Sequence, residues 1–158
     1  MKKKIILLAF AAVVFAACGN DNKANNSTPA DSSSENTAAP DASTYDPKRG
    51  LGKYDKVDLN ATLDPALIEK GKAVFNLKCI ACHKLTDEKY VGPGWKGVTK
   101  RQTPQWIMNF ITNPDPMIDK DPELQKQLEI CLTRMPNQNI TDEDARGVLE
   151  LMRENDEK

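Results

Sequence analysis

The feature that most constrains this chain is the run Cys79-Ile80-Ala81-Cys82-His83. Two cysteines one helical turn apart can each add across one of the two vinyl groups of a haem, so that two thioethers hold the porphyrin covalently. The next residue, His83, then lies under the iron and can coordinate it through an imidazole nitrogen. The run therefore predicts one covalently attached haem c, held by Cys79, Cys82 and His83.

A cysteine pair of this spacing has three other uses. A thioredoxin-type pair normally follows a β-strand and opens a helix, whereas here the pair closes a helical pattern with no strand-like alternation before it. A structural disulfide is the second alternative, because exported proteins form such bonds. A zinc site that adds Cys131 is the third, although the adjacent Cys82 and His83 would point poorly at one tetrahedral ion.

Residues 1–17 have the form of an export signal, in which three lysines precede an apolar run too short to span a bilayer comfortably. The sequence from Phe15 to Gly19 resembles a bacterial lipobox, with Phe15 where leucine is usual. The resemblance implies cleavage before Cys18 and lipidation of Cys18, which would anchor the protein on the periplasmic side of a bacterial membrane. Ordinary secretory cleavage near the same point, giving a soluble protein, is the alternative.

The next segment, residues 18–58, is rich in Asn, Ser, Thr, Ala, Asp and Pro and has almost no large apolar residue before Tyr45. Such a composition cannot form a core, so we expect a disordered linker between the lipid anchor and a folded domain at 59–158; partial order from Tyr45 to Tyr54 is left open. About 40 residues of this kind reach roughly 35 Å. Without the leader the chain has 19 basic and 23 acidic residues, a net charge near −4, which argues against a nucleic-acid partner.

Within 59–158 the sequence predicts four main helices. Asp64-Pro65, Thr103-Pro104 and Asp121-Pro122 each pair a capping residue with proline at the first helical position, and Thr141 begins a capping-box variant. Residues 90–97 and the segment from Asn113 to Pro116 are predicted as loops that contain glycine or proline. The expected inward faces are Leu67, Gly71, Phe75, Cys79 and Cys82; Trp106, Ile107, Phe110 and Ile111; Leu124, Leu128, Cys131 and Leu132; and Ala145, Val148, Leu149 and Met152. No segment alternates as a strand does, so the predicted fold is all-α.

In this order of features the chain resembles a class I monohaem cytochrome c over residues 63–152. The resemblance rests on Gly71-x-x-x-Phe75, the Cys79–His83 run, Gly92-Pro93, Met135-Pro136 and an amphipathic last helix. It implies that the first and last helices cross closely, which accounts for a glycine at position 71. It also implies that the Pro93 carbonyl accepts a hydrogen bond from His83 and that Met135 is the distal ligand. The insertion between Phe110 and Met135, which carries Cys131, is less typical of that family.

The residues alone narrow the set of candidates for the second axial ligand. His83 is the only histidine, so two histidines of one molecule cannot both bind the iron. Methionine, lysine, water and an exogenous ligand are left. Met108 and Met152 fall within predicted helices, where core packing is expected. Met117, in a proline-rich loop, competes with Met135 for the role. Cys131 is interpreted as a small apolar residue on a buried face, with a reactive thiol as the alternative.

Two strong protein ligands would fill both axial positions and leave no vacancy for a substrate. We therefore expect a monomeric electron carrier of a respiratory chain, not an enzyme, with redox proteins as partners and the membrane reached through the lipid anchor. Six basic and two acidic residues between Lys78 and Arg101 suggest docking to an acidic partner; solvated charge without a role is the alternative. The rival function is a haem enzyme or gas-binding sensor with an open or labile sixth position.

Overall fold

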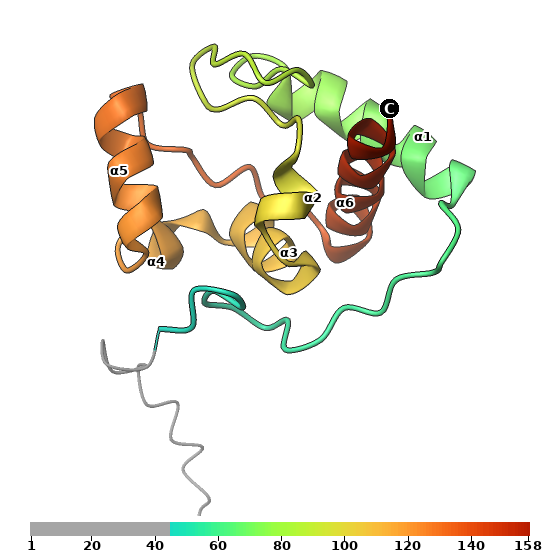
Figure 1. Cartoon of the computed structure of the whole chain (residues 1–158), viewed down its shortest axis with the longest axis horizontal. Coiled ribbons are helices and arrows are strands. Elements are labelled where there is room, and N and C mark those ends of the chain that lie inside the picture. Colours follow the sequence, from blue (N-terminus) through green and yellow to red (C-terminus); the bar gives the residue numbers. More distant parts are fainter. Residues whose placement is uncertain (1–44) are drawn as a thin grey trace, which may run out of the picture. The chain divides into compact units, whose positions relative to one another are not determined.

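A computed structural model describes residues 45–158; the leader, Cys18 and the first part of the linker lie outside the described residues. Over 45–158 the chain is helical and contains no strand, which confirms the all-α prediction (Figure 1). The helices are α1 (Pro65–Val74), the π-helical η2 (Phe75–Cys79), α2 (Val98–Arg101), α3 (Pro104–Thr112), α4 (Pro114–Ile118), α5 (Pro122–Cys131) and α6 (Asp142–Glu157). In this part of the chain, none of the helices is both long and apolar enough to pass through a membrane.

The helices begin where the capping signals predict. The Asp64 carboxylate accepts hydrogen bonds from the backbone N–H groups of Ala66 and Leu67, and Asp121 caps α5 in the same way. The Thr103 and Thr141 hydroxyls accept from the third residue of α3 and of α6. Each cap satisfies N–H groups that have no partner inside the helix, so these four starts are encoded locally.

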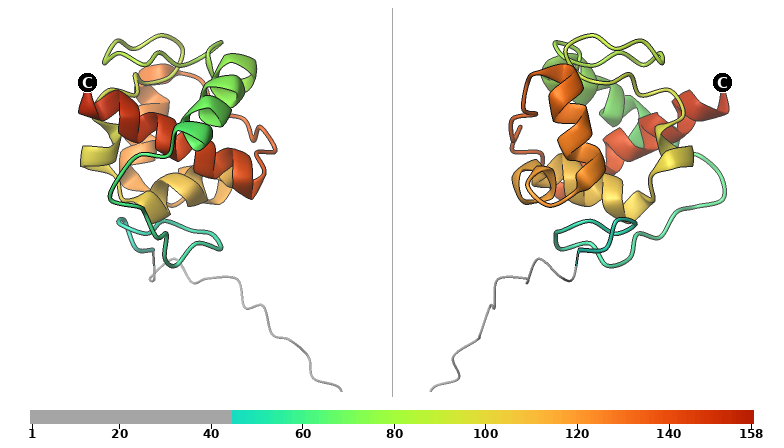
Figure 2. Two further views of the ribbon diagram at one scale, coloured as in Figure 1. Left: turned by 90° about the vertical axis from the view of Figure 1, so that its right-hand side faces the viewer. Right: turned by 60° about the vertical axis from the view of Figure 1, so that its left-hand side comes forward.

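The first and last helices cross at two glycines. A Cβ atom on Gly71 would lie 2.2 Å from the carbonyl oxygen of Gly147 and 2.9 Å from the Cβ of Leu151. Only a residue without a side chain allows the backbones of α1 and α6 to approach so closely. The crossing is visible in both views of Figure 2. It confirms the close approach that Gly71 implied.

The core lies between α1 with η2, α3, α6 and the chain before α2. Trp95 packs edge-on against Phe75, with ring centroids 4.9 Å apart, and Trp106 stacks on Phe110 at the same separation. The predicted inner face of α6 is buried as expected, at Ala145, Val148, Leu149 and Met152. These contacts fix α3 and the segment around Trp95, which form walls of the cavity described below.

A segment before α1 also packs on the domain. Residues 45–54, which we call the strap, run along α3 and α4 (Figure 1). The buried Asn109 amide donates to the carbonyls of Arg49 and Tyr54 and accepts from the Tyr54 N–H. The sequence assigns these residues to the linker because most of them are polar, and it leaves open whether they are ordered. The strap backbone is ordered by side chains of α3 that are distant in the sequence.

Three local features differ from the sequence predictions. The two short helices α2 and α4 were not expected, and α4 places Met117 in the core, completely buried, not in a loop. Leu132 was predicted on the inner face of α5, but it follows the helix in a left-handed conformation (φ 56°) and is 86% exposed. The apolar stripe of α5 faces a cavity, so no residue of this helix is fully buried.

A buried carboxylate joins α6 to the start of α1. Glu150 is completely buried and accepts hydrogen bonds from Arg146, Arg153 and the backbone N–H of Asp64. Burial alone would raise the pKa of Glu150, but these hydrogen bonds together lower it below its usual range. The ionised carboxylate is therefore the form that the folded protein stabilises.

The pH dependence of stability should reveal this carboxylate. Its contribution is complete above the unfolded-state pKa of about 4.3 and is lost as the pH falls through the lower folded-state value. At pH 7, Glu150→Gln should lower the free energy of unfolding by about 3 kcal/mol or more, because two arginines lose their buried partner. Urea unfolding of the haem-loaded protein at pH 7, 5 and 3 should show this deficit shrinking with acid. Glu157→Gln, at the exposed end of α6, is the control; a Glu150→Gln deficit that does not change with pH would contradict the assignment.

Candidate functional site

The cysteine pair is placed by the π-helical turn that ends α1. The N–H of Ile80 donates to the carbonyl of Phe75 at 2.9 Å, one residue farther back than in an α-helix. The N–H groups of Cys82 and His83 then both donate to the Cys79 carbonyl, at 3.0 and 2.9 Å. The turn therefore carries all three predicted haem-binding residues on one short, hydrogen-bonded unit.

A hydrogen bond fixes the orientation of the His83 ring. Its Nδ1 lies 2.8 Å from the carbonyl oxygen of Pro93, the contact that the resemblance implied. Burial lowers the pKa of His83 and outweighs the opposite effect of the Pro93 carbonyl, so the ring is held neutral. In this tautomer Nδ1–H donates to Pro93, and Nε2 keeps its lone pair for a metal.

Gly92 completes the support of the histidine. A Cβ atom at this position would lie 2.5 Å from Cε1 of His83, so glycine is required for the ring to occupy its place. The Gly92 N–H also donates to the Cys82 carbonyl at 2.8 Å, which ties the loop back to the cysteine turn. The sequence predicted the role of Pro93 through the family pattern but not this steric role of its neighbour.

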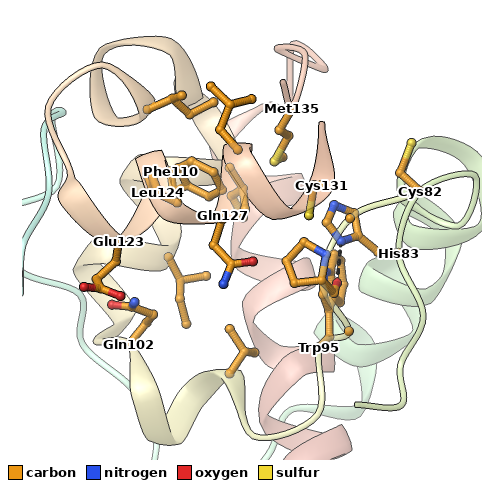
Figure 3. Close-up of a pocket in the computed structure, with 18 of the residues that line it drawn as sticks. Cys82, His83, Trp95, Gln102, Phe110, Glu123, Leu124, Gln127, Cys131 and Met135 are labelled. Atoms are coloured by element: carbon orange, nitrogen blue, oxygen red, sulfur yellow. Dashed lines mark hydrogen bonds between the residues drawn. The ribbon is translucent and has the colours of Figure 1, made fainter. Parts of the chain in front are cut away.

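His83 and Met135 face one cavity of about 340 Å³ (Figure 3). Cys82 and His83 form one part of its lining, and Met135 reaches it from the segment that follows α5. Cys79 lines a smaller adjoining cavity of about 40 Å³, together with Met135 and His83. Apolar side chains of α3 and α5 form much of the remaining wall: Trp106, Ile107, Phe110, Ile111, Leu124 and Leu128.

None of the other methionines of the described residues is placed to bind the iron from the loop opposite His83. Met117 and Met108 are in the core, 0% and 3% exposed, and neither is among the residues that line the cavity. Met152 does line it, but from within α6, where it is part of the core cluster. Of the two candidates that the sequence left open, Met135 is the one in the same cavity as His83.

Cys131 lines the main cavity from the end of α5 (Figure 3). It is partly exposed rather than buried as predicted, because the helix face that carries it borders open space. Cys79, Cys82 and Cys131 are all free thiols, and burial raises the pKa of the Cys79 thiol to about 11. Neither the disulfide nor the zinc alternative is formed by the described residues, in which no three metal-binding side chains cluster.

The end of the cavity away from Cys82 is polar. Gln102, at the end of α2, and Glu123 and Gln127, on α5, point toward it (Figure 3). Arg101 also lines the cavity, while its guanidinium donates to the Lys96 carbonyl at 2.9 Å. Gln102, Glu123 and Gln127 were not identified as site residues from the sequence. Polar residues on a helix normally face solvent, and these three share a cavity only because α2 and α5 meet in the fold.

The side chains of this cavity fit a covalently attached haem. Two thiols on one helical turn, a neutral imidazole and a thioether are the groups that attach and ligate haem c. The apolar walls suit a porphyrin face, and the amides of Gln102 and Gln127 and the guanidinium of Arg101 at the far end can donate hydrogen bonds to its carboxylates, whereas the Glu123 carboxylate cannot. Cys79 and Cys82 would form the thioethers, while His83 and Met135 would supply the axial ligands.

Comparison with known proteins agrees with this chemistry. The Cytochrome c family matches residues 68–156. A cytochrome c from Rhodothermus marinus superposes with a TM-score of 0.64 at 38% identity, over 67% of this chain and 90% of that one. An engineered form of it gives 0.64 at 36%, over 68% and 92%. A "Cytochrome c-553-like" protein from Synechocystis is 29% identical over 59 residues, 35% of this chain and 56% of that relative's length. The chain belongs to the cytochrome c family, whose members bind haem c covalently and serve in electron transfer.

Proposed function

We propose that this protein is a membrane-tethered electron carrier of a respiratory chain outside the cytoplasm, with His83 and Met135 as the axial ligands of its haem. The observation that carries the proposal is the shared cavity: the imidazole fixed by Pro93 and the Met135 thioether both face it. A carrier needs both axial positions filled by the protein, because a filled site leaves no vacancy for a substrate.

The protein side chains tune and protect a one-electron couple. When bound, haem c supplies the exchange of its iron between the ferrous and ferric states. The Pro93 carbonyl orients the His83 ring and increases the basicity of its other nitrogen. The Met135 sulfur favours the ferrous state and so raises the potential. The apolar walls from α3 and α5 limit the access of water.

A spectrum and a redox titration test the proposal. Expressed with a haem-attachment system, the protein should show a covalent haem spectrum and one reversible one-electron wave. Cys79→Ala together with Cys82→Ala should abolish covalent attachment. A protein that gains no haem under these conditions would overturn the proposal in favour of a haem-free redox or metal-binding module.

The anchor is a separate part of the proposal. Cytochromes c are generally exported to the periplasm. For this chain the lipobox-like segment around Cys18 supports lipidation, and the polar residues that follow suit a tether. At about 0.8 kcal/mol per buried methylene, more than one acyl chain makes anchoring stable.

Loss of the anchor should leave the domain intact. Cys18→Ser should move the protein from the membrane to the soluble fraction, because the acyl chains are lost, with no change in the haem spectrum. Fractionation of expressing cells and absorption spectroscopy measure both. Cys131→Ser is the matched control and should stay with the membrane. Wild-type protein found entirely in the soluble fraction would refute lipidation.

The surface beside the cysteine pair supports docking to an acidic redox protein. Leu77 and Ile80 next to the cysteines are 81% and 52% exposed. The ammonium groups of Lys78 and Lys89 hydrogen-bond to backbone carbonyls, which hold these charges in place without cancelling them. Lys96 also bonds to a carbonyl but lies near the Asp156 carboxylate, and Lys84 pairs with Glu88. The basic residues of the segment are Lys78, Lys84, Lys89, Lys96, Lys100 and Arg101.

Electron transfer to the physiological partner should slow as ionic strength rises, because screening weakens the steering of a basic surface to an acidic one. Oxygen uptake by respiratory membranes supplied with the reduced protein measures the rate. Lys78→Gln should lower it at low salt, whereas Lys56→Gln, outside this segment, should not. A rate that is independent of salt would count against electrostatic docking.

A further inference from the structure

We propose that the strap and helix α4 hold the Met135 segment against the cavity, with Arg134 and Asp121 as its positioning residues. The inference rests on the proposed role of Met135 as the distal ligand. It assigns a function to a part of the chain, residues 45–54, that lies far from the cysteine turn in the sequence.

The Met135 segment needs such support. Residues 132–141 contain no regular secondary structure, and they begin with Leu132 in a left-handed conformation that costs a non-glycine residue free energy. Among the helices of residues 45–158, the preceding helix α5 packs mainly against α4, and none of its residues is fully buried. Packing alone therefore gives this side of the cavity little to keep Met135 in place.

The first connection is the Arg134 guanidinium, next to Met135. Its Nε donates to a carboxylate oxygen of Asp115 at 3.0 Å, and its Nη2 donates to the Asp115 carbonyl and pairs with Asp119, each at 3.0 Å. A planar guanidinium that engages three oxygens fixes direction as well as distance, which an ammonium cannot do. The residue before Met135 is thus fastened to α4.

Helix α4 is in turn held by the strap. Met117 is completely buried, and a Cβ atom on Gly50 of the strap would lie 2.3 Å from its Cε. Gly50 has φ +72°, a conformation that favours glycine. The strap backbone is itself fixed by the three hydrogen bonds of Asn109. The strap therefore packs against Met117 of α4, the helix whose residues Asp115 and Asp119 bind Arg134.

The second connection is the carboxylate of Asp121, which is 3% exposed. One oxygen accepts hydrogen bonds from the Tyr45 hydroxyl of the strap and, at 3.2 Å, from the indole Nε1 of Trp106. The other caps α5 at the backbone N–H of Glu123, at 2.8 Å. One buried group thereby joins the strap, α3 and the helix that leads into the Met135 segment.

The test uses haem-loaded protein and two signals that report the distal ligand. These are the sulfur-to-iron charge-transfer band of the ferric form and the rate of carbon monoxide binding to the ferrous form. Asp121→Asn should weaken the band and speed carbon monoxide binding by about tenfold, because the detached state of Met135 becomes more populated. Arg134→Gln should change both in the same direction by about threefold, since its ion pairs are partly exposed to solvent. Arg134→Lys should lie between wild type and Arg134→Gln.

Two controls separate positioning from general loss of stability. Glu150→Gln removes a buried carboxylate at the α1–α6 side and should leave both signals unchanged at temperatures where it is folded. Lys126→Gln removes an exposed charge of α5 and should also change neither. Wild-type signals in both Arg134→Gln and Asp121→Asn would overturn the inference, as would equal changes in Glu150→Gln. A wild type without the band would overturn the proposed ligand set, and with it this inference.

Discussion

Gly71→Ala is expected to prevent or severely weaken folding of the domain. The added methyl group would lie 2.2 Å from the carbonyl oxygen of Gly147, a backbone atom that can move only if α1 and α6 separate. In an isolated helix the same substitution would stabilise by up to about 1 kcal/mol. The steric cost should reverse that sign and reach or exceed the upper end of the roughly 1–3 kcal/mol typical of overpacked cores.

Gly147→Ala is the matched control for this prediction. Its Cβ would meet the nitrogen of Gly71 at 3.0 Å and the carbonyl oxygen of Leu67 at 3.1 Å, contacts that a shift of a few tenths of an ångström relieves. We expect a loss of about 1 kcal/mol there. Thermal unfolding and the yield of haem-loaded protein measure both variants. If Gly71→Ala is as stable as wild type, the close crossing of α1 and α6 does not require glycine at position 71.

Met135→Ala is expected to change the redox properties while the haem stays attached, because Cys79 and Cys82 are untouched. Loss of the thioether should lower the potential by on the order of 0.1 V or more, since axial ligands govern haem potentials. The sulfur-to-iron band of the ferric protein should vanish. Carbon monoxide and cyanide should bind faster, because the sixth position no longer has a protein ligand.

Met117→Leu is the control that removes the competing sulfur. Leucine keeps the volume of a completely buried side chain, so the contact with the strap should survive at a cost below about 1.5 kcal/mol. The band and the potential should match those of wild type. Absorption spectra and potentiometric titrations distinguish the two variants. A band lost in Met117→Leu and kept in Met135→Ala would reverse the assignment of the ligand.

The sequence predicts well the features that depend on neighbouring residues. The four helix caps, at Asp64, Thr103, Asp121 and Thr141, act on N–H groups two or three residues away, so their signals are complete within a short window. Gly71 is different in kind: a glycine on an apolar helical face implies a close neighbour, although only the structure identifies that neighbour as Gly147.

What the sequence could not predict depends on segments that meet only in the folded chain. Glu150 has the composition of a surface residue, and its burial requires Arg146, Arg153 and the N–H of Asp64 to converge on it. The strap has the composition of a linker, and its order comes from Asn109 of α3. The same limit applies to the site.

Within the site, the Cys79–His83 run and Pro93 were recognisable from pattern. The polar group at Gln102, Glu123 and Gln127 was not, because α2 and α5 bring it together across about 20 residues of sequence. The place of Met117 was misjudged because a proline-rich stretch reads as a loop. Two prolines can instead occupy the first turn of a short helix such as α4.

The most direct test of the central claim, a haem whose two axial positions are filled by this protein, is the addition of carbon monoxide to the reduced wild-type protein. The absorption spectrum should stay unchanged over minutes, because His83 and Met135 both remain bound. Rapid formation of a carbon monoxide complex by the intact wild type would contradict the claim and would instead identify a haem protein with an open sixth position.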